Sequence, residues 1–261
     1  MAENLHDSFE RRLQERQQST HPLATVPTDA QPHGNIPNTP LAVSTISFIL
    51  GALFSLGLVL FLSGAVSSRW WATQQLGLFV AAWSWFHWAE FAVTAGWNLE
   101  KCSVDSFLLD NGAMYHIANG TALAEYLVAL YLYPSSKTFP YLSELGVLMV
   151  LSGQVLRTTA MVHASTNFSH AVAFRKRESH MLVTDGIYSW FRHPSYAGFF
   201  YWALGTQMVL QNPVSFAAFV IILWRFFYRR IRAEEKALLL FFGNDYEVYR
   251  RHAGTKIPLI P

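Results

Sequence analysis

The sequence predicts an all-α, polytopic integral membrane protein with about six transmembrane helices, the last two of which form a tight hairpin. Hydrophobic residues make up 52% of the chain and charged residues only 14%, whereas soluble domains carry about 25% charged residues. Six apolar stretches follow a polar start, and about 20 helical residues suffice to cross the hydrocarbon layer. A single cysteine, Cys102, excludes an internal disulfide and a multi-cysteine metal site.

Composition also divides the chain. Residues 1–38 are polar and rich in Pro, Gln and Thr, so we expect a disordered cytoplasmic tail there, with no cleavable signal peptide. Residues 39–97 are expected to form the first two transmembrane helices. Residues 98–261 are expected to form a core of four further transmembrane helices with cytoplasmic segments at 163–193 and 229–261. The net charge of +2 gives no reason to expect a nucleic-acid partner.

The first expected helix, 41–66, carries small residues on one face. Ser47, Gly51 and Ser55 are spaced by four residues, a pattern that lets two helix backbones approach closely. It fits either a homodimer or a contact inside the protein, and we favour the internal contact.

Polar side chains interrupt the second and third expected helices, 70–97 and 112–133. His87 and Glu90 lie in the second and His116 in the third. Such groups are costly in lipid and are therefore expected to face protein or water. We favour interhelical hydrogen bonds. A metal site is disfavoured because the residues lie on separate helices without a signature spacing, so no metal is expected.

The fourth expected helix, 139–162, carries Arg157 near its end, where the side chain can extend to the lipid headgroups. The last two, 194–211 and 213–228, are joined by Asn212-Pro213 alone. This pair is a turn signal, so the two helices must form an antiparallel hairpin. Lys and Arg cluster in the connecting segments on one side of the bilayer, which predicts that both termini are cytoplasmic.

The two ends of the hairpin carry the residues that indicate chemistry. Pro194 suits the first position of a helix, and the positive helix end with Arg192 before it favours an anion. The alternative is a plain helix start with Arg192 at phospholipid headgroups. Arg230 and Glu234 are four residues apart and share a helix face. They can pair with each other, or they can point in opposite senses at a substrate and a cofactor.

Further motifs extend this pattern over residues 98–261. They are the loop Ser103 to Asp110 with Tyr115, Asn167 to His170, Leu182 to Tyr188, Arg192 to Gly198, Gly205 to Gln207, Asn212-Pro213, Arg230 with Glu234-Glu235, and Phe241 to Gly243 with Tyr246 and Tyr249. Together they resemble the isoprenylcysteine carboxyl methyltransferases. The layout of about six helices resembles the shorter, yeast-type members of that family.

The resemblance implies a methyltransferase core at 98–261 with a cofactor pocket at its cytoplasmic face. It implies an endoplasmic reticulum enzyme that moves a methyl group from S-adenosylmethionine to the terminal carboxylate of a prenylated cysteine, as carried by small GTPases and similar lipidated proteins. Arg230 falls on the position that holds the substrate carboxylate and is the expected catalytic and substrate-binding residue. By position, the cofactor contacts fall on His180, Met181, Leu182, Val183, Tyr188, His193, Pro194, Ser195, Tyr196 and Glu234. Arg157, Asn167 and His170 are expected as wall or support.

Two other classes of protein fit parts of the pattern. A phospholipid N-methyltransferase, or more remotely an NADPH-dependent sterol reductase, shares such a pocket at the end of a helical hairpin. An amine acceptor calls for a general base and no carboxylate-holding arginine, so Arg230 favours the prenylcysteine hypothesis. A non-enzymatic membrane scaffold or channel would leave the clustering of His193, Tyr196, Arg230 and Glu234 without a purpose.

Overall fold

The computed structural model of the chain describes residues 35–172, 176 and 180–261. Its long helices are α2 (Pro40–Ser63), α3 (Gln74–Trp97), α4 (Ala113–Leu132), α5 (Leu142–Ala164), α6 (Pro194–Val209) and α7 (Pro213–Phe242), followed by the shorter α8 (Asn244–His252). The six long helices begin within a few residues of their expected positions. The one β-bridge among the described residues joins Phe191 to Gly254. The all-α prediction is therefore confirmed.

Short 3-10 turns connect the helices: η2 (Leu99–Lys101), η3 (Val104–Phe107), η4 (Pro134–Lys137), η5 (Ser165–Asn167) and η6 (Gly186–Ser189). The expected tail lies outside the described residues up to position 34. Asn35 donates to the Asp110 carboxylate at 2.8 Å, and Asn38 accepts from the Val104 N–H at 3.0 Å. Contact with the folded body thus begins inside the segment expected to be a tail.

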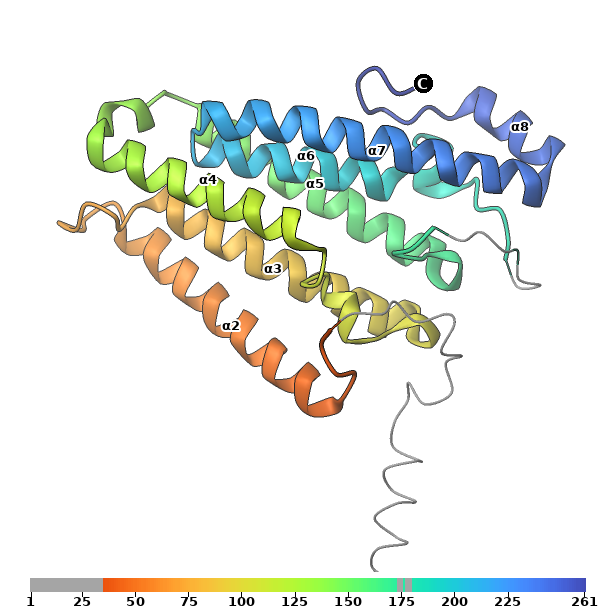
Figure 1. Cartoon of the computed structure of the whole chain (residues 1–261), viewed down its shortest axis with the longest axis horizontal. Helices are drawn as coiled ribbons and strands as arrows, with labels where there is room; N and C mark the ends of the chain where they lie inside the picture. The colour runs from red at the N-terminus through yellow and green to blue at the C-terminus, as the bar shows by residue number, and fades with distance from the viewer. Residues whose placement is uncertain (1–34, 173–175, 177–179) are drawn as a thin grey trace, which may run out of the picture.

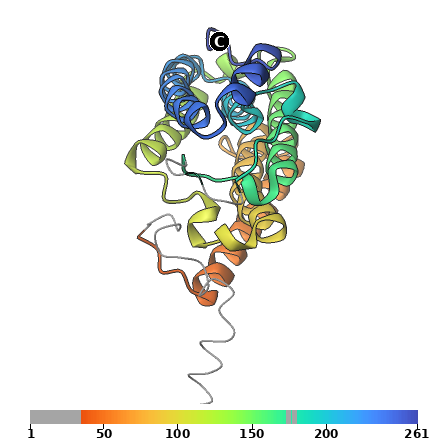
Figure 2. The same cartoon turned by 90° about the vertical axis from the view of Figure 1, so that its right-hand side faces the viewer.

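The helices run roughly alongside one another, with α2 at one edge of the bundle next to α3 (Figure 1). Helices α5 and α6 pack along each other, and α7 lies against α6. After a quarter turn, α2 is seen on the side of the molecule opposite to α7 and α8 (Figure 2). The carboxy-terminal half therefore forms one packed group, while α2 packs mainly on α3.

The antiparallel contact between α5 and α6 depends on facing glycines. A Cβ added to Gly153 would lie 2.6 Å from the Gly198 carbonyl oxygen, and one added to Gly146 would lie 2.8 Å from the Gly205 carbonyl oxygen. Both distances are shorter than any real Cβ contact, so only glycine permits this backbone approach. The contact fixes the start of α6, which bears the expected site residues, against α5.

Replacing Gly198 with leucine is therefore expected to lower the free energy of unfolding by about 3 kcal/mol, because the two backbones must separate. Thermal unfolding in detergent measures the effect. Gly120→Ala is the matched control, since nothing lies within 4 Å of a Cβ at that helical position. Equal melting temperatures for the two variants would contradict the role assigned to the α5–α6 contact.

The internal contact expected for the Ser47, Gly51 and Ser55 face of α2 is wrong. A Cβ on Gly51 would meet nothing within 4 Å, whereas one on Gly57 would lie 2.6 Å from the Ala81 nitrogen of α3. Helix α2 packs on α3 through the face that bears Leu50 and Gly57, about a third of a turn away from Gly51. Of the two contacts proposed for the face with Ser47, Gly51 and Ser55, the homodimer contact therefore stays a prediction.

The turn between α6 and α7 is held by charged side chains of neighbouring segments. Asn212 precedes Pro213, and the Glu125 carboxylate of α4 accepts from the N–H groups of Val214 and Ser215 at 3.0 and 2.6 Å. Lys137 Nζ donates to the Gln211 carbonyl at 2.9 Å. The hairpin expected from the sequence is thus formed, and a carboxylate satisfies the positive start of α7.

Two segments of the described chain, Pro40–Ser63 and Leu142–Asn167, are by themselves long and apolar enough to cross a membrane. Leu41, Phe48 and Leu62 on α2 are about three-quarters exposed, as suits a lipid-facing surface. The other expected crossings do not reach that standard of length and apolarity. Helix α6 has 16 residues, and α7 continues for 30 residues, well past the span expected to end at 228.

Candidate functional site

A pocket opens where the ends of α5, α7 and α8 meet the start of α6. Its empty volume, including the part open to solvent, is about 660 Å³. Every residue expected to contact a cofactor lines it: His180, Met181, Leu182, Val183, Tyr188, His193, Pro194, Ser195, Tyr196 and Glu234. Sequence reasoning did not assign cofactor contacts to the remaining lining residues, which are Ala164, Asn167, Phe168, Ser169, Arg192, Leu238, Tyr246 and Tyr249.

One side of the pocket is built around the Tyr196 hydroxyl. Tyr196 donates to Glu234 Oε2 at 2.5 Å and accepts from Arg230 Nε at 2.8 Å. The His193 ring stacks on the Tyr196 ring with 5.4 Å between centroids. The hydroxyl therefore stands between Arg230 and Glu234, which do not form the self-contained pair that their spacing allowed. Glu234 lines the pocket, whereas Arg230 lies behind Tyr196 and outside the lining.

The segment that leads from His180 to α6 is tied down at several points. The Met181 N–H donates to Asn167 Oδ1 at 2.8 Å, and Tyr188 donates to the Ala160 carbonyl at 3.2 Å. Tyr249 donates to the Tyr188 carbonyl at 2.7 Å. Burial raises the pKa of both tyrosines, so they remain protonated donors at neutral pH. Asn167 thus supports the pocket wall, as expected from the sequence.

Tyr246 provides an observation that bears on what the pocket can hold. Its hydroxyl is buried and has no hydrogen-bond partner in the part of the chain that the structure describes, and the residue lines the pocket. A buried unpaired hydroxyl costs free energy unless a ligand or water satisfies it. Glu234 adds a carboxylate to the same pocket. The lining therefore suits a molecule that has both hydrogen-bonding groups and positive charge.

Arg192 lines the pocket, and contacts inside the protein hold its guanidinium. It is buried, with 7% of its surface exposed, and it pairs with Glu235 at 2.7 Å. It also donates to the carbonyls of Ala253 at 2.8 Å and Pro261 at 2.6 Å. Arg192 thus fastens the carboxy-terminal segment to α7. No sequence motif indicates this role, because most of the acceptors are backbone carbonyls.

Glu235 should make stability depend on pH. Burial raises its pKa, but the hydrogen bond from His193 and the charge of Arg192 outweigh burial, so the net shift is downward. Its stabilisation is complete above the unfolded value of 4.5 and is lost as pH falls through the lower folded pKa. Glu235→Gln is expected to cost about 1 to 2 kcal/mol at neutral pH. In thermal unfolding at several pH values, this difference should shrink in acid; a difference that does not change with pH would contradict the Arg192 contact.

The anion site expected at the start of α6 is weaker than predicted. Pro194 has no N–H, and the Tyr196 N–H, which a bare helix start would leave free, donates to the His193 carbonyl at 3.1 Å. The turn therefore offers an anion fewer free donors than a bare helix start.

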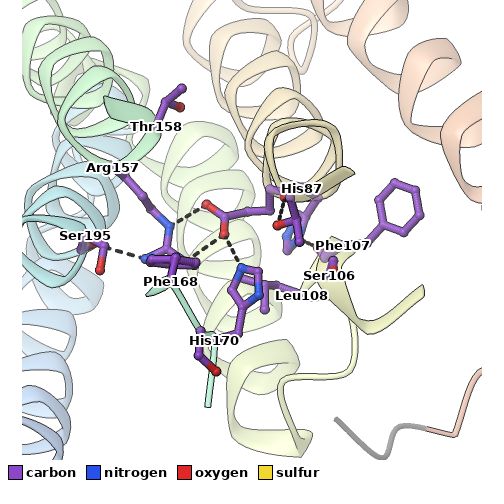
Figure 3. A network of polar contacts seen from close by, with 12 residues as sticks. His87, Ser106, Phe107, Leu108, Arg157, Thr158, Phe168, His170 and Ser195 are labelled. Atoms are coloured by element: carbon purple, nitrogen blue, oxygen red, sulfur yellow. Dashed lines mark hydrogen bonds and ion pairs between the residues drawn. The ribbon is translucent and has the colours of Figure 1, made fainter. Parts of the chain in front are cut away.

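Behind this turn lies a buried polar network, shown in Figure 3. Glu90 on α3 pairs with the Nε and Nη2 of Arg157 on α5, the latter at 2.7 Å, and with His170 Nε2 at 3.0 Å. The interhelical contact expected for Glu90 is confirmed. The expected extension of Arg157 to lipid headgroups is wrong, since its side chain is buried against Glu90. The interhelical hydrogen bond expected for His87 is also confirmed, since its ring bonds Tyr115 of α4 at 2.6 Å as well as the Phe107 carbonyl at 2.7 Å.

Comparison with known proteins identifies relatives along most of the chain. Residues 146–240 match the model of the isoprenylcysteine carboxyl methyltransferase (ICMT) family. The protein-S-isoprenylcysteine O-methyltransferase of Saccharomyces cerevisiae is 42% identical, over 89% of this chain and 97% of its own length. The enzyme of that name from Xenopus laevis is 43% identical, over 81% of this chain and 71% of its own length.

A solved structure is also similar. It is described as the eukaryotic intramembrane Ras methyltransferase ICMT without a monobody, and it superposes with a TM-score of 0.76 at 37% identity. The similarity covers 84% of this chain and 83% of that one. Identity at this level over nearly whole chains, together with the shared helical fold, shows that this protein is a membrane protein and belongs to the isoprenylcysteine carboxyl methyltransferase family.

Proposed function

We propose that this protein transfers a methyl group from S-adenosylmethionine to the carboxylate of a carboxy-terminal prenylated cysteine, at the boundary between membrane and cytosol. The observation that carries the proposal is the bridge from Glu234 through Tyr196 to Arg230. It places a carboxylate on the pocket side of one tyrosine and a guanidinium on the other side. A positively charged cofactor and a negatively charged acceptor can therefore bind next to each other.

The pocket residues fit the cofactor. S-adenosylmethionine, when bound, supplies a methyl group activated by a positively charged sulfur. Glu234 offers the negative charge for such a cation, and Tyr246 offers a buried hydroxyl that lacks a partner among the described residues. Met181, Leu182 and Val183 add apolar surface. We assign cofactor binding to these side chains together with His180, Tyr188, His193, Pro194, Ser195 and Tyr196.

Arg230 is assigned to the carboxylate of the acceptor. A terminal carboxyl group has a pKa of about 3.5, so it is ionised at neutral pH and needs no general base. Arg230 donates through Nε to the Tyr196 hydroxyl and through Nη2 to the His170 carbonyl. Within the described residues, Nη1 is left to bind a carboxylate. The chain then contributes alignment and charge, while burial of Tyr196 and its neighbours keeps water away.

The surroundings support the finer parts of the proposal. Helix surfaces with exposed leucine and phenylalanine suit contact with lipid, from which a prenyl chain can reach the site. The clustering of Arg and Lys in the segments beside the pocket supports cytoplasmic termini. Location in the endoplasmic reticulum and prenylated small GTPases as substrates follow from the family resemblance and form part of the proposal.

Methyl incorporation tests the proposal directly. Purified protein in vesicles is given labelled S-adenosylmethionine with a farnesylated cysteine, a phospholipid bearing a primary amine, or an unprenylated cysteine peptide. We expect label in the farnesylated cysteine alone, in a base-labile methyl ester. Label in the phospholipid would instead support N-methylation, and no label in any acceptor would contradict enzymatic methyl transfer.

A further inference from the structure

Glu90 is a buried carboxylate of α3 that lies outside the pocket lining. It is 1% exposed, and it holds Arg157 of α5 and His170 of the segment after α5. Figure 3 shows Arg157 and His170 converging from different parts of the chain. Because one carboxylate holds both side chains, the positions of these two segments depend on each other.

Through Arg157, Glu90 is connected to the part of the site that is assigned to the cofactor. Arg157 Nη1 donates to the Ser195 carbonyl at 3.1 Å, and Ser195 lines the pocket in the first turn of α6. The guanidinium also lies 5.5 Å from the ring centroids of Phe86 and Phe199. It therefore has little freedom, and the first turn of α6 is held at a set distance from Glu90.

Through His170, Glu90 is connected to Arg230, the residue assigned to the acceptor carboxylate. The His170 carbonyl accepts from Arg230 Nη2, and Phe168 and Ser169 just before it line the pocket. Since His170 is held by Glu90 through its ring, the carbonyl that orients Arg230 is held as well. Glu90 is thus two contacts away from Arg230 and two contacts away from Ser195.

Stability alone is a poor explanation for such a group. A buried ion pair often contributes no more than well-packed apolar side chains would, because both charges lose their hydration. What the pair does provide is a fixed geometry, with two donors of one guanidinium on one carboxylate.

We propose that Glu90 is a positioning residue for methyl transfer, which sets the α6 start and Arg230 at the separation that the reaction needs. The proposal rests on the assignment of the cofactor to the pocket and of the acceptor to Arg230. Neither ligand touches Glu90. Its loss should therefore affect the alignment of the bound ligands more than the binding of either one.

The test compares Glu90→Gln, which keeps the shape and removes the charge, with Thr94→Val. Thr94 lies one turn away on α3, is 2% exposed, and touches Glu90 only at its backbone carbonyl. Each protein is measured for melting temperature, equilibrium binding of S-adenosylmethionine, and kcat and KM with farnesylated cysteine. Glu90→Gln is expected to lower kcat on the order of 100-fold, with cofactor binding changed by no more than about threefold. Thr94→Val should keep kcat within about twofold of the unmodified protein.

A kcat for Glu90→Gln within about twofold of the unmodified protein would overturn the inference, and so would a fall in kcat that merely matches lost cofactor binding. Wild-type protein that binds no S-adenosylmethionine would instead overturn the proposed function. His170→Ala provides a second arm if Glu90→Gln does not fold. His170→Ala should lower kcat with the cofactor affinity kept, and the double variant, where it folds, should be no worse than Glu90→Gln. If the losses in kcat of the two single variants add up in the double variant, Glu90 and His170 act independently and the inference is wrong. An unchanged kcat in His170→Ala would contradict it as well.

Discussion

Replacing Arg230 with alanine is expected to lower methyl transfer by at least about 100-fold, while the protein still inserts into membranes and remains folded in detergent. Arg230 is the cation that the proposal assigns to the acceptor carboxylate, and its loss leaves that charge without a partner as water is excluded. The Tyr196 hydroxyl also loses the donor that holds it at 2.8 Å. Initial rates with farnesylated cysteine at saturating S-adenosylmethionine measure the effect.

Arg232→Ala is the matched control for that experiment. Arg232 lies two residues further along α7 on the exposed side, where it stacks 4.9 Å from the Tyr228 ring centroid. Its removal should leave the rate within about twofold of the unmodified protein. If Arg230→Ala retains near-full activity, or if Arg232→Ala loses as much, the substrate role of Arg230 is wrong.

The second large effect is expected for Glu234→Ala, which should abolish methyl transfer chiefly by weakening cofactor binding. Glu234 is the carboxylate on the pocket wall, and it accepts from Tyr196 at 2.5 Å. A hydrogen bond between this carboxylate and a charged group of the cofactor would be worth about 1.5 to 3 kcal/mol, so its loss should raise the dissociation constant roughly 10- to 150-fold. Titration with labelled S-adenosylmethionine measures it.

Glu247→Ala serves as the control for Glu234, because Glu247 pairs with Arg250 and Arg251 on the outer side of α8 and does not line the pocket. It should bind the cofactor with unchanged affinity. Glu234→Ala with an unchanged dissociation constant and full activity would remove this residue from the site.

The helix layout could be predicted from the sequence because its signals are local. Apolar length gives the position of each helix, and Asn212-Pro213 gives the hairpin. The faces by which helices meet were less predictable. Gly51 and Gly57 of α2 are both small, and the choice between them depends on Gly77 and Ala81 of the partner helix, which no pattern within α2 reveals.

The pocket lining was predictable for a different reason. Motif positions carried over from the family resemblance point to residues 180–196 and 234, and these meet in one pocket. The residues that hold this lining in place were harder to predict. Glu90 and Arg157 were visible as charges in apolar helices, but their sequence separation is 67 residues. Arg192 is a similar case, since backbone carbonyls of the last residues satisfy it.

The central claim is that the pocket formed by residues 180–196 and Glu234 holds S-adenosylmethionine. Ultraviolet cross-linking of labelled S-adenosylmethionine to the purified protein, followed by peptide mapping, tests it most directly. We predict adducts within residues 180–196 or on the aromatic side chains Tyr246 and Tyr249, which face the same pocket, and we predict their loss in the presence of S-adenosylhomocysteine. Competed adducts confined to segments of an active preparation that do not line the pocket would contradict the claim.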